Sequence, residues 1–185
     1  ELRYDLILAV RERSAQRAAA VAHRFVDTAR LGGVDVDGWA SCGSFSETNR
    51  QLVAHARLCD LAIVEQAEPG RPKPADAFIE TLLMRTGRPA IVVPYAHDRP
   101  AVFNHVTVAW DASVVSARAL ADSIPFLQRA SSVEVICVET ERLPDDRARD
   151  ERIVRHLARH GIDARARTIS STLSKPLAVI CAGSK

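Results

Sequence analysis

The sequence predicts an α/β fold: a doubly wound, mostly parallel sheet made of two pseudo-repeated halves. Segments with the helical spacing of apolar residues alternate with short strand-like runs along most of the 185 residues. The runs 61–64 and 89–94 are almost wholly apolar, which is typical of parallel strands covered on both faces. Two stretches of the chain also match each other in the order of their elements. Such alternation predicts helices on both faces of the sheet.

Composition and charge are those of a globular chain and exclude several classes of function. Hydrophobic residues make up 47% and charged residues 26%, and the formal net charge of +2 is too small to indicate a nucleic-acid partner. No apolar stretch has the length of a membrane span, so we expect no membrane partner. No signal peptide is recognisable, although the chain begins at Glu1 without a Met.

The four cysteines form no CxxC pair, and none has a histidine at metal-ligand spacing. Cys59 and Cys137 lie in or beside apolar strand-like runs, so we expect both to be buried thiols. This usage predicts no bound metal and fits a reducing cytoplasm.

The first half, residues 1–97, is expected to hold a partial copy of the fold unit. Residues 1–31 have helical periodicity, and the glycines at 32 and 33 end that helix. Val34–Ala40 then alternates apolar and polar residues, as a half-buried strand does. Ser44 or Ser46 can cap the next helix, and Ser44 has a glutamate three residues later, the spacing of a capping box. A short strand, a proline-rich loop, a helix and a second strand follow in that order (61–64, 68–74, 76–84 and 89–94).

Residues 98–104 are the expected linker, because they contain a proline and several polar residues. The second half, 105–185, opens with the clearest strand–helix–strand pattern in the chain. Its first strand ends at Asp111, Ser113 can cap the helix, and Pro125 marks the last turns of that helix. The expected elements are, in order, strand 106–110, helix 114–129, strand 133–138, helix 145–160, strand 162–169 and the apolar run 177–180.

The internal repeat aligns Phe25–Asp35 with Ile153–Asp163 when one residue is skipped at the glycines. In both, an amphipathic helix ends at glycine, and an apolar-Asp pair opens an alternating strand. Farther along, Leu61–Val64 has its counterpart in Leu177–Ile180. The shared order of elements indicates a duplication.

Both copies are incomplete. The first lacks an opening strand, a helix and a second strand. The second has these, but only residues 171–176 separate its third strand from Leu177, too few for the helix of the first copy. We therefore expect the second unit to be truncated after its third or fourth strand.

The junction at the end of the first strand of the second half carries the most specific motif. Val106–Ser113, followed by Ala117–Asp122 and Val133–Val135, resembles the start of a universal stress protein domain. In bacterial tandem members of that family, this strand commonly ends in an Ala-Trp-Asp-Gly-Ser-like run before an Ala-rich helix. Gly87–Tyr95 is similar to the last strand of the first domain, and Arg155–Ile162 also resembles the family. The resemblance implies a five-stranded parallel sheet of the Rossmann-like (HUP) class with helices on both sides.

Many members of the family bind ATP, so the resemblance implies an adenine-nucleotide site. The acid that ends the first strand contacts the nucleotide, which matches Asp111, and the residue that ends the second strand contacts adenine through its backbone, which matches Val138. Both positions lie at strand carboxyl ends, where ligands bind in open α/β sheets. Gly183, in the final Gly183-Ser184-Lys185, is the residue left to represent the phosphate-binding glycines.

The phosphate side of that site departs from the family pattern. Binders carry a Gly-x-x-Gly and a later Gly-Ser/Thr after the fourth strand, so that backbone N–H groups approach the phosphate oxygens. After Val64 this chain instead reads Glu65-Gln66-Ala67-Glu68-Pro69-Gly70-Arg71-Pro72. The acids repel phosphate and the prolines lack N–H donors. Weak or lost ATP binding is therefore expected.

Other candidate residues have two interpretations each. Asp111 can contact a ligand or support the start of the following helix, and Trp110 can pack beside a nucleotide or in the core. His156 and His160 have metal-ligand spacing on a helix, but no His-Glu-x-x-His arrangement surrounds them, which favours surface histidines. The hydroxyls of 170–172 have no recognisable base, which argues against a serine nucleophile.

Three functional hypotheses follow. The first is a non-catalytic, homodimeric stress-response protein of the universal stress protein type, with weak or lost adenine-nucleotide binding. The second is a nucleotide-binding α/β enzyme, a hydrolase or transferase, which needs a phosphate loop and a general acid or base. The third is a signalling receiver domain, which needs clustered acids that Asp111 alone does not supply.

Overall fold

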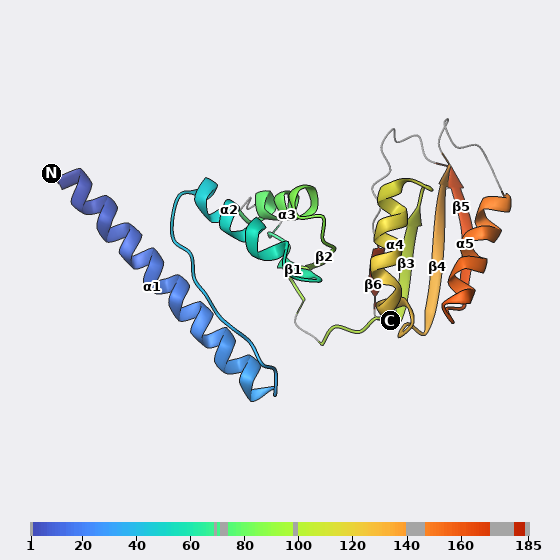
Figure 1. The fold of residues 1–185 in the computed structure, drawn as a ribbon, viewed down its shortest axis with the longest axis horizontal. Coiled ribbons are helices and arrows are strands. Elements are labelled where there is room, and N and C mark those ends of the chain that lie inside the picture. The colour runs from blue at the N-terminus through green and yellow to red at the C-terminus, as the bar shows by residue number, and fades with distance from the viewer. Residues whose placement is uncertain are drawn as a thin grey trace. The chain divides into compact units, whose positions relative to one another are not determined.

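The computed structural model describes residues 2–68, 70, 74–97, 100–139, 147–170 and 180–183. It is a mixed α/β structure that divides into two compact units, residues 1–97 and 98–185 (Figure 1). The helices are α1 (Leu2–Leu31), α2 (Phe45–Ala56), α3 (Pro74–Arg85), α4 (Val114–Leu127) and α5 (Arg147–Arg159), and the strands are β1 (Ala62–Glu65), β2 (Ala90–Val93), β3 (His105–Trp110), β4 (Ser132–Glu139), β5 (Ala164–Ser170) and β6 (Ile180–Gly183). None of the described helices combines the length and apolar character that a membrane crossing requires.

The long helix α1 ends as its sequence predicts. Gly33 has a φ of 75°, and the Val34 N–H donates to the Ala29 carbonyl at 3.0 Å. This bond spans five residues and closes a Schellman motif, for which a glycine in the left-handed region is suited. The helix therefore stops at Leu31.

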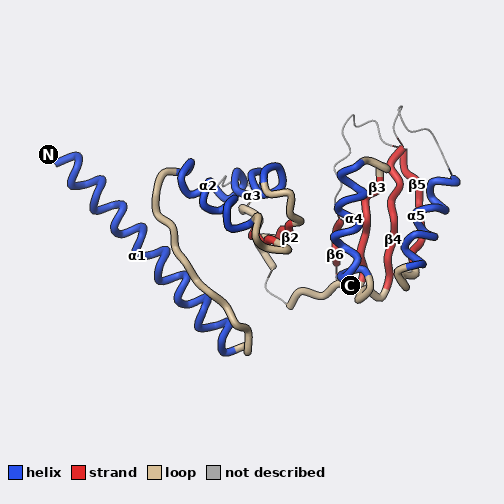
Figure 2. Tube along the Cα trace, viewed as in Figure 1, coloured by secondary structure: helices blue, strands red, loops and turns tan. Residues whose placement is uncertain are grey.

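The segment after α1 does not form the predicted strand. Residues 34–40 are not assigned to a strand, and they run as a chain alongside α1 (Figure 2). Gly38 permits this close approach, because a Cβ at Gly38 would collide with the Val26 side chain. An alternating sequence becomes a strand only when another strand offers hydrogen-bond partners, and the described residues of this unit provide none for 34–40.

Helix α2 begins with the predicted capping box, with Ser44 rather than Ser46 as the N-cap. The Ser44 N–H donates to Oε2 of Glu47 at 2.9 Å, and the Glu47 N–H donates to Oγ of Ser44 at 3.3 Å. The Ser44 N–H and the Ser44 hydroxyl, which donates to the same Oε2 at 2.9 Å, hold the pKa of Glu47 below its usual value. The rings of Phe45 and Phe78 lie 5.1 Å apart, which joins α2 to α3.

The sheet of unit 1 has two described strands, and its core is small. β1 and β2 pair in parallel, with Ala62 opposite Ala90. Among the described residues, the buried apolar side chains of this unit are those of Ala56, Ala67 and Leu82. An isolated two-stranded sheet is marginally stable in water, so α3 and Leu82 carry much of the packing.

Unit 2 contains a four-stranded sheet in the order β5-β4-β3-β6. β3, β4 and β5 are parallel to one another, so the sheet is mostly parallel, as predicted. Val106 pairs with Val133, and Val133 pairs with Ala164, which places these three residues on one face. That face forms the buried core together with side chains of both helices (Val106, Val108, Leu120, Leu127, Val133, Val135, Cys137, Ile153, Leu157, Ile162 and Ala164).

Because α4 and α5 both contribute to this one core, they cover the same face of the sheet. The chain steps from β3 to β4 to β5 in one direction, and right-handed crossovers then place successive helices on the same side. On the other face, Nε of Arg167 forms an ion pair with Oε1 of Glu134 at 3.1 Å. A doubly wound arrangement, with helices on both faces, is therefore not confirmed within the described part of unit 2.

Strand β6 corrects one prediction. The apolar run 177–180 was expected to repeat the parallel strand 61–64, but the observed strand begins at Ile180 and is antiparallel to β3. A parallel strand beside β3 needs a crossover of a dozen or more residues. Only the nine residues 171–179 lie between β5 and β6.

Residues 177–179 lie outside the described residues, as do Asp145, Asp146, Ser171 and Thr172.

The two helices aligned by the sequence repeat end in the same way. In α5 the Ile162 N–H donates to the Leu157 carbonyl at 3.1 Å, and Gly161 has a φ of 75°. The same bond and the same φ occur at Gly33 after α1. The likeness ends there, because α5 leads into the paired strand β5 whereas α1 leads into the unpaired residues 34–40.

Candidate functional site

The carboxyl end of β3 turns sharply into α4 through Asp111, Ala112 and Ser113. Ala112 has a φ of 59° and is the one non-glycine residue with positive φ in the described part of the chain. This region costs an L-residue roughly 1–2 kcal/mol, and such residues cluster at functional sites. This is a conformation for which glycine is suited.

Asp111 is partly buried and is bound to the start of α4. Its Oδ1 accepts the Ser113 N–H at 3.0 Å. Burial raises the pKa of Asp111, but hydrogen bonds from Ser113 and Ser116 outweigh burial and hold the pKa below its usual value. Asp111 is therefore ionised at neutral pH and supports the helix start. Its role as a ligand contact stays a prediction.

Ser113 is the N-cap of α4, as predicted, and its Oγ accepts the Ser116 N–H at 3.1 Å. We expect Ser113→Ala to lower the free energy of unfolding of unit 2 by about 1 kcal/mol, because the Ser116 N–H loses its acceptor. The substitution also removes a hydrogen bond that lowers the pKa of Asp111, so that pKa should rise toward its usual value. Urea unfolding measures the first effect, and NMR titration of the carboxylate measures the second.

The contribution of the ionised Asp111 carboxylate to the free energy of unfolding depends on pH. Because its pKa is lower in the folded chain, the stabilisation is complete above the unfolded pKa of about 3.9 and is lost as the pH falls through the folded value. The stability gap between the wild type and Ser113→Ala should therefore narrow below about pH 4. The exposed Ser131 supplies the control. An equal loss in Ser131→Ala would contradict the capping argument.

Val138 lies beside Asp111 at the same edge of the sheet. Trp110, the last residue of β3, pairs with Cys137 in parallel register. Asp111 follows directly after β3, and Val138 follows Cys137 on β4. The structure thus brings together the two residues that the resemblance assigns to the adenine side. This edge is where ligands bind in open parallel sheets.

Gly183 lies at the opposite end of β3. It pairs with His105, the first residue of that strand. Six strand residues span about 16–20 Å, so Gly183 is far from Asp111 and Val138. The antiparallel direction of β6 explains the separation, because it carries the chain away from the carboxyl edge.

Trp110 packs against the core of unit 2, as the core interpretation predicted. Its Nε1–H is buried and has no acceptor among the described residues. A buried donor without a partner costs about 1–3 kcal/mol.

The described residues contain no group of three His, Cys, Asp or Glu side chains that could hold a metal ion. His156 and His160 lie with ring centroids 4.9 Å apart on α5. Cys137 is buried, as predicted. The expectation for Cys59 was wrong: this residue is exposed, because it follows the end of α2 instead of lying inside a strand.

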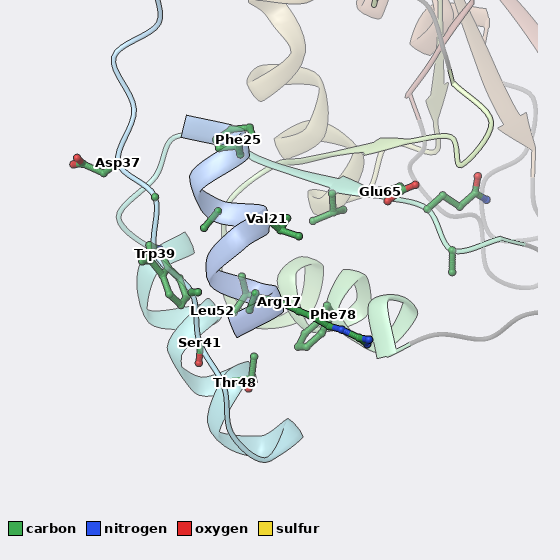
Figure 3. A pocket seen from close by; sticks show the side chains of 17 residues that line it. Arg17, Val21, Phe25, Asp37, Trp39, Ser41, Thr48, Leu52, Glu65 and Phe78 are labelled. Carbon is green, nitrogen blue, oxygen red and sulfur yellow. The ribbon is translucent and has the colours of Figure 1, made fainter. Parts of the chain in front are cut away.

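Unit 1 contains a pocket that the sequence did not indicate. Its volume is about 830 Å³, which is within the usual range for ligand sites. Figure 3 shows Val21 and Phe25 of α1, Trp39 of the segment after it, Leu52 of α2 and Phe78 of α3 around this space. The complete lining is Arg17, Ala18, Val21, Ala22, Phe25, Asp37–Ser41, Thr48, Leu52, Val64–Ala67 and Phe78.

Two residues that line this pocket are held by residues that do not line it. The Trp39 ring stacks on His55 with centroids 4.4 Å apart, and the Ser41 hydroxyl is hydrogen-bonded to Gln51. No local signal in the sequence indicates the pocket, because residues from five separate segments line it.

Comparison with known proteins found no protein-family model that matches the chain and no curated protein that matches it.

Proposed function

We propose that this chain is a universal stress protein-like, non-catalytic stress-response protein whose second unit binds adenine nucleotides weakly or not at all. The observation that carries the proposal is the strand-end turn of β3. There Asp111 lies beside Val138, and Ala112 has the left-handed conformation expected of the family's glycine. The resemblance of Val106–Ser113 to the family motif adds to this argument.

We expect weak nucleotide binding because of the strand that lies beside that turn. A phosphate cradle at this edge needs a parallel strand next to β3 whose carboxyl end presents backbone N–H groups. Strand β6 occupies that side of β3 and runs antiparallel, so it ends at the opposite edge. In unit 1, Glu65 at the end of β1 and Glu68 after it repel phosphate.

The state of Asp111 supports a non-catalytic role. A carboxylate with a lowered pKa is a poor proton acceptor at neutral pH, because general bases work best with a pKa near the working pH. Its oxygen is already engaged by the Ser113 N–H. Homodimerisation and a cytoplasmic location belong to the same proposal through the family resemblance.

Calorimetric titration of the full chain with ATP tests the proposal. We expect a Kd weaker than about 100 μM, which corresponds to roughly −5.5 kcal/mol. We also expect ATP and adenosine to bind within about threefold of each other, because the phosphates gain few contacts. A Kd for ATP that is tighter than about 100 μM and at least tenfold tighter than the Kd for adenosine would show that the phosphates are bound. That result would contradict the proposed absence of a phosphate cradle.

A turnover assay separates this proposal from the enzyme alternative. Steady hydrolysis of ATP that is abolished by Asp111→Ala would establish the enzyme. Asp122→Ala is the matched control, because Asp122 is ion-paired with Arg118 on the surface of α4 and lies away from the turn.

A further inference from the structure

Strand β1 has one edge that no strand of the described chain pairs with. The N–H groups of Ala62 and Gln66 donate to the carbonyls of Pro89 and Val93 on the β2 side. Backbone groups of successive strand residues point in alternate directions. The N–H and C=O groups of Ile63 and Glu65 therefore point to the other edge. Unpaired edges of this kind are templates for pairing with another chain.

The pocket of unit 1 lies at this edge. It is lined by Val64–Ala67 from β1 and its continuation and by none of the β2 residues. The lining also includes Asp37–Ser41 of the extended segment after α1. This segment has the alternating sequence of a strand, yet it pairs with no strand among the described residues. The pocket is an open groove that both segments border.

The surfaces around the pocket are the kind that an added strand covers. Phe25 is 60% exposed and Val21 is 58% exposed, although both line the pocket. Exposed apolar groups gathered in this way mark interaction surfaces. Figure 3 shows Glu65 at the β1 side of the pocket, whereas the Asp37 carboxylate points away from the other lining residues. Because Glu65 is on β1 itself, we expect an occupant with a basic residue near Glu65 and an apolar centre.

We propose that the pocket of unit 1 binds an extended polypeptide segment of a partner protein, which adds a strand to the free edge of β1. The main-chain groups of Ile63 and Glu65 supply the hydrogen bonds, and alternate apolar side chains of the segment enter the pocket. This is strand addition, in which backbone bonds give affinity and side-chain pockets give selectivity. It goes beyond nucleotide binding and does not depend on it.

The probe is a fluorescein-labelled peptide with the sequence of His105–Trp110, the first inner strand of unit 2, and a lysine at each end. Fluorescence anisotropy with the 185-residue chain should give a Kd tighter than about 100 μM. Hydrogen exchange should show new protection at residues 62–67. The same peptide with one central residue replaced by proline should not bind, because it cannot continue the ladder.

Substitution at position 65 separates main-chain pairing from other kinds of binding. Glu65→Pro removes an N–H from the free edge and leaves the Ala62 and Gln66 bonds to β2 in place, and proline is tolerated on edge strands. It should weaken peptide binding at least tenfold. Glu65→Ala keeps the N–H and should weaken binding by no more than about threefold, the loss expected of one exposed charge pair. Thermal unfolding checks that both variants are folded.

Three results would overturn the proposal: no binding of the peptide, equal binding to Glu65→Pro and wild type, or protection only within residues 105–183. A wild-type dimer that Glu65→Pro converts to a monomer would also overturn it, since the edge would then be taken by a second copy. Each of these results leaves the ATP titration of unit 2 unaffected.

Discussion

Leu157→Ala is expected to lower the free energy of unfolding of unit 2 by about 2–5 kcal/mol. The Leu157 side chain is 0% exposed and lies in the core between α5 and the sheet. Its removal leaves a cavity beside Val135 and Ile153, which belong to the same cluster. The lost burial and the unfilled cavity both act against the folded state. A loss at the upper end of this range is comparable to the whole stability of a small domain.

Urea unfolding followed by the fluorescence of Trp110, in a background where Trp39 is replaced by phenylalanine, measures this loss. Val115→Ala is the control, because Val115 lies on α4 and is 66% exposed. It should change the free energy of unfolding by no more than about 0.5 kcal/mol. Equal effects of the two substitutions would show that α5 does not pack on the sheet as described.

Local signals in the sequence predicted most of the elements. Gly33 and Gly161 end their helices as expected, because a glycine accepts positive φ where other residues are strained. Ser44 and Ser113 begin theirs, because a hydroxyl accepts an otherwise unpaired N–H group. These predictions concern interactions within a few residues, so the sequence of a short window contains all that is needed.

The predictions that failed concern distant partners. The alternation of 34–40 is that of a strand, but pairing depends on a neighbouring strand elsewhere in the chain. The direction of β6 depends on where β5 ends and on how many residues lie between them, and an apolar run carries no information about direction.

The candidate site shows the same difference between features set by nearby residues and features set by distant ones. Asp111 and Val138 could be placed together from the sequence, because each lies at the carboxyl end of a strand of one strand–helix–strand unit, within a residue of where β3 and β4 end, and such strands are parallel. Gly183 could not be placed, since its position depends on the direction of β6. The pocket of unit 1 could not be predicted either, because it is formed by residues from five separate segments.

Leu82→Ala is expected to unfold unit 1 while unit 2 stays folded. Leu82 is 1% exposed and is the largest of the buried side chains described in unit 1, where the others are alanines. The substitution should cost about 2–5 kcal/mol, and a unit with so small a core has little stability in reserve. Hydrogen exchange should show protection lost in α2, α3, β1 and β2, with β3, β4 and β5 unchanged.

The neighbouring residue supplies the matched control for this prediction. Leu83 is on the same helix and is 49% exposed, so Leu83→Ala should leave the exchange pattern of unit 1 nearly unchanged. If Leu82→Ala also removed protection from β3 and β4, the two units would unfold together and the division after His97 would not be an energetic one. If the strand peptide binds at β1, adding it should restore protection to Leu82→Ala, because a ligand that binds only the folded unit stabilises that unit.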